Sequence, residues 1–243
     1  MGMDGDVKAT GLISKVLAPA MRLWLRSQLE QIEQLDLQIL AGDRQILSGQ
    51  IPQVLLSAQS AVYQGIHLSQ VNLVGQAIQV NLGQVMRGKA LQLLAPVPID
   101  VVLSLTEADL NASLNAPLLA PAIGDFLKLL FASGIAEVDN ASPELKIENL
   151  QAKLAESWLT LSGQLLGSSQ VTPIALRTGL TLTMPNQIQL TQPQWLPHPT
   201  AKRGLPLEDL EGYSFDLGEG TEIEQLALLD DRIHLQGRLQ VSP

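Results

Sequence analysis

The sequence contains no cysteine among its 243 residues, which excludes disulfides, thiol catalysis and cysteine-rich zinc sites. Aromatic residues make up 3% of the chain, so its apolar mass consists of Leu, Ile, Val and Ala. Charged residues account for 16%, against roughly 25% in typical soluble domains. No run approaches the roughly 20 apolar residues of a membrane-spanning helix. The apolar excess therefore belongs to a large core, to the wall of an apolar cavity or to a membrane-facing patch.

The charged and catalytic residue types are equally sparse. A net charge of −9 excludes a general nucleic-acid binder, because neutralising phosphates requires clustered Lys and Arg. The chain has no G-x-S-x-G elbow, no phosphate loop and no G-x-G-x-x-G motif. Its histidines are His67, His198 and His234, and Asp230 and Asp231 near the last of these are ordinary residues for a hairpin turn. We therefore expect no catalytic residue, no metal and no cofactor, and hence a protein that is not an enzyme.

The N-terminal sequence, MGMDGDVKATG, is acidic and polar. A secretory signal would instead have a basic segment followed by an apolar one. We therefore expect a cytoplasmic protein that associates peripherally with a membrane.

A short pattern occurs three times along the chain. Each copy has Ile-Glu, a polar residue and Leu, then a turn, and then a Gly in an apolar segment. The first residues of the copies and their glycines, which follow 17, 16 and 14 positions later, are Ile32 and Gly49, Ile147 and Gly163, and Ile223 and Gly237. In residues 31–51 apolar and polar positions alternate on either side of a Gly-Asp pair, which predicts two strands joined by a tight turn. A Gly inside a strand indicates a bulge or bend, so the pattern predicts a curved sheet built from repeated hairpins.

The order of patterns predicts one domain over residues 1–243 with an α+β fold. We expect a long, strongly curved antiparallel sheet, a long N-terminal helix and a central pair of helices. The expected regions are a helix over 9–31, strands over 31–106, helices over 106–134, strands over 143–193, a long connection over 193–220 and a terminal hairpin over 221–243. Within them the predicted strands are 54–63, 66–74, 77–85, 89–93, 99–105, 144–154, 157–166, 173–184 and 187–192. The predicted central helices are 107–115, with Thr106 as N-cap, and 121–133, and one helical turn is expected near 207–211.

The predicted N-terminal helix is apolar around most of its circumference. Lys15, Arg22 and Arg26 form one narrow basic stripe, and the remaining positions are mostly apolar. Pro19 predicts a kink or break near Ala18. Two interpretations fit this pattern: a helix in a sheet groove or on an anionic membrane, with the basic stripe outward, and an ordinary core helix with a solvated edge.

Several longer stretches resemble the LmeA-like phospholipid-binding family, a former domain of unknown function that is frequent in cyanobacteria. The stretches that carry the resemblance are LISKVLAPAMRLWLRSQLE, GDRQILSGQIPQVLLSAQSAVYQGIHLSQV, NLGQVMRGKALQLLAPVPI and LTEADLNASLNAPLLAPAI. The family has no single diagnostic catalytic motif. The resemblance implies a fold similar to the tubular lipid-binding proteins, in which the strongly curved antiparallel sheet wraps around the long N-terminal helix and the central helical pair. It also implies that residues 1–243 form a single lipid-binding domain that holds a phospholipid in an elongated apolar groove.

This resemblance and the apolar helices together predict a non-enzymatic binder, and a possible carrier, of phospholipid or another acyl lipid. The residues expected to contact acyl chains are Leu17, Met21, Trp24, Leu25, Leu37, Ile39, Phe126, Leu127, Leu130 and Phe131. The head-group candidates are Arg22, Arg26, Arg87 and Lys89. The alternatives are a membrane-surface interaction module without a lipid cavity and, less favoured, a lipid-modifying enzyme.

Overall fold

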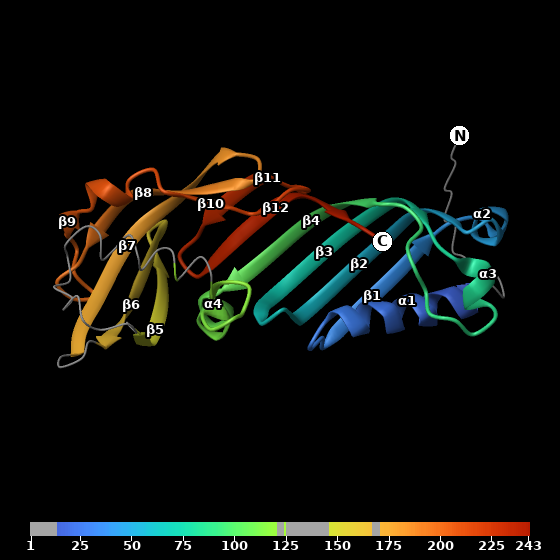
Figure 1. Cartoon of the computed structure of the whole chain (residues 1–243), viewed down its shortest axis with the longest axis horizontal. Coiled ribbons are helices and arrows are strands. Elements are labelled where there is room, and N and C mark those ends of the chain that lie inside the picture. Colours follow the sequence, from blue (N-terminus) through green and yellow to red (C-terminus); the bar gives the residue numbers. More distant parts are fainter. Residues whose placement is uncertain (1–13, 121–123, 125–145, 167–170) are drawn as a thin grey trace, which may run out of the picture.

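The computed structural model describes residues 14–120, 124, 146–166 and 171–243, and its strands form two antiparallel sheets (Figure 1). The sheets follow one another along an elongated molecule. Sheet 1 has the strand order β1 (Gln34–Leu40), β2 (Gln50–Tyr63), β3 (Ile66–Gln79), β4 (Val97–Thr106), β12 (Arg232–Val241) and β11 (Thr221–Leu228). Sheet 2 has the order β10 (Ser214–Asp216), β8 (Gln187–Trp195), β7 (Val171–Met184), β6 (Trp158–Leu166) and β5 (Lys146–Ala155), and β9 (Leu205–Pro206) also pairs with β8.

The architecture differs from the single curved sheet that the sequence predicts. The last hairpin returns along the molecule, and β12 pairs with β4, so both ends of the described chain contribute to sheet 1. Neither sheet closes on itself. The predicted antiparallel strands are present, but a tube wrapped around a long helix is not what the structure shows.

Alternation of apolar and polar residues gives sheet 1 one apolar face, called here its inner face. The register places Leu37, Leu56, Leu73, Val101 and Gly237 in one row across five strands. Successive side chains of a strand point to opposite faces, so residues two positions from this row, such as Ile39, Val54 and Gly75, also point inward. The inner face at the β1–β3 end forms the main apolar core of the protein.

Helix α1 (Ser14–Gln28) lies along this inner face near β1 (Figure 1). Its Leu17 and Met21 are buried in the core of sheet 1. Pro19 lies inside α1 without ending it, so the predicted break does not occur. No described helix is long and apolar enough to cross a membrane.

The other helices whose bounds the structure describes are short. They are α2 (Asp43–Leu47), α3 (Leu82–Val85), α4 (Glu107–Ser113) and the 3-10 helix η1 (Glu208–Leu210). The predicted cap of α4 is confirmed: Thr106 Oγ1 accepts a hydrogen bond from Asp109 N at 3.2 Å, and Asp109 Oδ2 accepts one from Thr106 N at 2.8 Å. Helix η1 confirms the predicted turn near 207–211. The predicted helix over 121–133 lies outside the described residues, apart from position 124.

Three local predictions are wrong. The expected tight Gly-Asp turn is instead α2, which begins where Gln45 Oε1 accepts a hydrogen bond from Gly42 N at 3.0 Å. The expected strand over 77–85 ends at Gln79, and α3 follows after Asn81. The segment expected as a strand over 89–93 has only an isolated bridge, between Leu93 and Val80.

The repeated glycines behave as predicted in two of the three copies. In the second copy the β5–β6 register shifts between Glu148 and Gln151, beside Gly163. In the third copy the β11–β12 register shifts next to Ile223, which pairs with Gly237. These two hairpins therefore share a bulge opposite a glycine, whereas the glycine of the first copy precedes β2.

The two sheets are joined along β5, the edge strand of sheet 2. Asn111 Nδ2 donates to Ala152 O and Asn111 Oδ1 accepts from Ala152 N, each at 2.8 Å. Glu107 Oε2 accepts from Leu154 N at 2.9 Å, and Asp230 Oδ1 accepts from the first amide after β5 at 2.9 Å. Side chains from α4 and from the β11–β12 turn thus occupy the hydrogen-bonding positions of a neighbouring strand.

Candidate functional site

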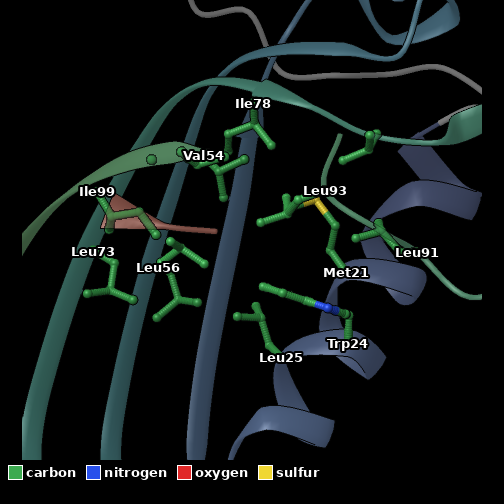
Figure 2. Close-up of a pocket in the computed structure, with 14 residues that line it drawn as sticks. Met21, Trp24, Leu25, Val54, Leu56, Leu73, Ile78, Leu91, Leu93 and Ile99 are labelled. Carbon is green, nitrogen blue, oxygen red and sulfur yellow. The ribbon is translucent and has the colours of Figure 1, made fainter. Parts of the chain in front are cut away.

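An apolar pocket lies between α1 and the inner face of sheet 1 (Figure 2). Helix α1 and strands β2 to β4 form most of its wall, and the segment between β3 and β4 and the last residue of β12 complete it. The fourteen lining residues are Met21, Trp24, Leu25, Val54, Leu56, Leu73, Gly75, Ile78, Val80, Leu91, Leu93, Val97, Ile99 and Val241. None of these side chains carries a charge or a carboxamide, so the wall offers area without directional polar contacts.

The periods of the helix and the strands explain why these side chains face the pocket. Positions 17, 21, 24 and 25 fall on one face of a helix, because residues three and four apart lie on the same side. On the strands, Val54 and Leu56 are two positions apart and face the same side of the sheet. Gly75 leaves room within this wall, because a Cβ atom there would lie 3.1 Å from Ile78 Cδ1.

The pocket has a volume of about 70 Å³. Pockets that enclose drug-sized ligands usually measure about 300–1,000 Å³, so an acyl chain does not fit the pocket in this conformation. Helix α1 differs from the strands in the pocket wall because it is not hydrogen-bonded into the sheet. Its Trp24 and Leu25 are only partly buried, in contrast to Val54 and Leu56 on the opposite wall.

Charged groups lie away from the pocket wall. Arg22 and Arg26 are exposed on the side of α1 that faces away from the sheet, and Arg87 and Lys89 are exposed in the turn after α3. None of the four lines the pocket, so any contact with a head group would occur at its rim.

The ion pairs among the described residues are elsewhere. Asp100 Oδ1 lies 2.9 Å from Arg238 Nε on the outer face of sheet 1, and this hydrogen bond raises the pKa of Arg238. In the β11–β12 turn the hydrogen bond from Arg232 lowers the pKa of Asp231. His234, near that turn, has its Nδ1 3.2 Å from Ser104 Oγ. No group of three or more metal-binding side chains occurs in the part of the chain that the structure describes.

A second hollow, of about 490 Å³, lies between α4 and strands β5 and β6. It is larger than the pocket under α1, but its wall is mixed, with Lys153, Thr160 and Ser162 beside apolar residues. Two of its polar groups, Glu107 and Asn111, already bind the backbone of β5. We regard the pocket under α1 as the candidate site, because its lining has a single chemical character.

The structure brings some of the sequence-predicted residues together and separates others. Met21, Trp24 and Leu25 line the pocket, whereas Leu17, Leu37 and Ile39 are buried in the adjoining core. Phe126, Leu127, Leu130 and Phe131 lie outside the described residues. Sequence reasoning missed the lining residues from β2, β3, β4 and β12 and from the segment between β3 and β4. Their alternation was visible, but the face that meets α1 depends on contacts between distant segments.

Comparison with known proteins identifies a family for the chain. No curated protein and no solved structure matches the chain significantly. The model of the LmeA-like phospholipid-binding family, which is described by binding and not by catalysis, matches residues 8–238. Since this match covers nearly all of the chain, the protein belongs to the LmeA-like phospholipid-binding family.

Proposed function

We propose that the protein binds a phospholipid without modifying it, with an acyl chain held between α1 and the inner face of sheet 1. The observation that carries this proposal is the pocket wall, in which every lining residue is apolar and α1 forms one side. The family match supports the ligand class.

The physical basis is the transfer of hydrocarbon out of water. Each buried methylene contributes about 0.8 kcal/mol, and an acyl chain needs no directional partner. Binding requires α1 to move outward, so Trp24 and Leu25 exchange contacts with the sheet for contacts with the lipid. The head group remains at the rim, where Arg22 and Arg26, or Arg87 and Lys89, meet its phosphate.

A carrier would release this lipid into a second membrane, which makes lipid transfer the extended form of the proposal. The small pocket volume, about 70 Å³, favours a second candidate function, in which the protein acts at a membrane surface without enclosing lipid. Extraction of lipid from vesicles by the pure protein distinguishes the two functions.

The proposal is tested by filling the pocket. Gly75→Val adds a branched side chain to the wall, and β-branched residues are favoured in strands. The control is Gly83→Ala in α3, because a Cβ atom at position 83 has no neighbour within 4 Å. Native mass spectrometry after gentle purification should show bound phospholipid in the wild type and the control, and about tenfold weaker binding in Gly75→Val.

A second variant acts in the opposite direction. Trp24→Ala enlarges the pocket and should raise the bound fraction or admit longer chains. Thermal unfolding of each variant checks that the fold persists. The proposal is wrong if the folded wild-type protein binds no phospholipid, or if both pocket variants retain wild-type occupancy.

A further inference from the structure

Four large apolar side chains are exposed on α1, at the end of α2 and in the segment between β3 and β4. Leu23 on the outer side of α1 is 73% exposed, Leu47 at the end of α2 59%, Met86 after α3 62% and Leu94 before β4 59%. Isolated exposed apolar residues are ordinary, but a group of them on neighbouring elements indicates an interaction surface.

Hydrogen bonds hold these segments together. Val80 N donates to Gly49 O at 2.9 Å, which ties the end of α2 to the start of the α3 segment. Leu94 N donates to Gln79 O at 2.9 Å, which closes that segment back onto the end of β3. Helix α1 contacts α3. Figure 1 shows α2, α3 and one end of α1 at the same extremity of the protein, the end remote from sheet 2.

The charge of these segments is opposite to that of the protein. Residues 14–28, 41–50 and 80–96 contain six of the 15 Lys and Arg residues and one of the 24 Asp and Glu residues. The exposed cations among the described residues of these segments are Arg22, Arg26, Arg44, Arg87 and Lys89, and the acid is Asp43. We call this surface, with Leu23, Leu47, Met86 and Leu94, the basic end.

We propose that the basic end docks on an anionic lipid bilayer, with the exposed apolar side chains inserted between head groups and the cations against phosphates. Charge complementarity selects this occupant, because a protein of net charge −9 presents cations here. A folded surface with basic residues around apolar ones binds at a membrane interface in two ways. Its apolar side chains leave water, and its cations are attracted to anionic head groups.

This inference rests on the proposed function and adds to it the route of the lipid. The segment between β3 and β4 contributes Leu91 and Leu93 to the pocket wall and Leu94 to the basic end. Helix α1 likewise has Leu25 on the pocket side and Leu23 on the exposed side. A bilayer at the basic end would therefore lie beside the movable wall, so an acyl chain could enter without crossing water.

The apolar contribution is tested by flotation with vesicles of phosphatidylcholine containing about one third phosphatidylglycerol. The variant Leu47→Asp/Met86→Asp should lower the bound fraction about tenfold. The matched control is Met184→Asp/Leu205→Asp on sheet 2, where the side chains are 56% and 71% exposed. The control should bind as the wild type does.

The charge contribution is tested in the same assay. Arg87→Glu/Lys89→Glu should abolish the preference for anionic vesicles over pure phosphatidylcholine, and added salt should weaken wild-type binding. Lys202→Glu/Arg203→Glu, which makes the same charge change in the loop between β8 and β9, is the control and should leave the preference intact. Equal losses in variants and controls, or no loss in either, would overturn the docking surface.

The outcomes separate this inference from the proposed function. If the basic-end variants bind vesicles as the wild type does while Gly75→Val loses phospholipid, the docking surface is wrong and the pocket proposal stands. If the wild type carries no phospholipid but binds anionic vesicles only through the basic end, the docking surface stands and the pocket proposal fails.

Discussion

Among single residues, Gly237 shows how strongly a repeat can constrain one position. A Cβ atom there would meet the carbonyl oxygen of Glu222 and would lie 2.9 Å from Ile223 Cα, so the clash is with backbone. Gly237→Ala should therefore destabilise the protein by about 1–3 kcal/mol. Thermal or urea unfolding of the variant measures this effect.

The second copy provides an internal comparison. A Cβ atom at Gly163 would lie 3.0 Å from Ile147 Cγ2, a side-chain methyl group that can move, and 3.2 Å from Glu148 O. This backbone contact is looser than those at Gly237, so Gly163→Ala should destabilise the protein less than Gly237→Ala. Gly83→Ala is the control without a clash. Equal stability of the Gly237→Ala and Gly83→Ala variants would show that the bulge in β11 adapts freely.

The same glycines show what could be predicted at this scale. A bulge near Gly163 and Gly237 follows from the pattern itself, because each hairpin is local in sequence. Gly49 is the corresponding glycine of the first copy but lies outside a strand, at φ +78° after α2. The side chain of Gln45 caps Gly42 and begins a helix where the pattern predicted a tight turn. The first copy therefore begins a helix with this side-chain hydrogen bond, although its sequence resembles the other two copies.

At the scale of elements, predictions succeeded where local chemistry decides. The Thr106–Asp109 cap is contained within four residues and was predicted. The segment 77–85 alternates as a strand should, yet Asn81 changes its course. Its Oδ1 accepts from Gln92 N at 2.8 Å and its Nδ2 donates to Ala90 O at 3.0 Å. These bonds fold residues 80–92 into a compact loop, and nothing in the local pattern indicates partners nine and eleven residues away.

Helix α1 should be the least protected wall of the pocket. Its Trp24 and Leu25 are partly exposed, and it lies on the sheet without joining its hydrogen-bond ladder, so it should open more readily than β2 and β3. Hydrogen exchange should therefore be faster in α1 than in those strands. Added phospholipid should slow exchange in α1 specifically. Equal protection of α1 and β3 without lipid would contradict a movable wall.

For the whole molecule, the sequence predicted antiparallel strands but not their division into two sheets. The strand pattern before residue 106 and after residue 143 is the same, so nothing in it separates the sheets. The division arises because the last strand, β12, pairs with β4 and completes sheet 1. Strands β5 to β10, which lie between β4 and β11 in the sequence, form sheet 2. The candidate site was also predicted only in part. The sequence predicted its lining residues on α1 but not those on the facing strands.

The contact between the two sheets includes Asn111 of α4, whose side chain bonds to the backbone of β5. Its amide replaces a strand neighbour for both backbone groups of Ala152, so Asn111→Ala leaves two groups of β5 without these partners. The substitution should destabilise the protein by about 1–3 kcal/mol and accelerate hydrogen exchange along β5, while β2 and β3 of sheet 1 keep their protection. Asn115→Ala, an exposed change just beyond α4, is the control and should alter neither quantity. If Asn111→Ala instead accelerated exchange equally in both sheets, the sheets would unfold as one cooperative unit and the side chain would not be a local joint.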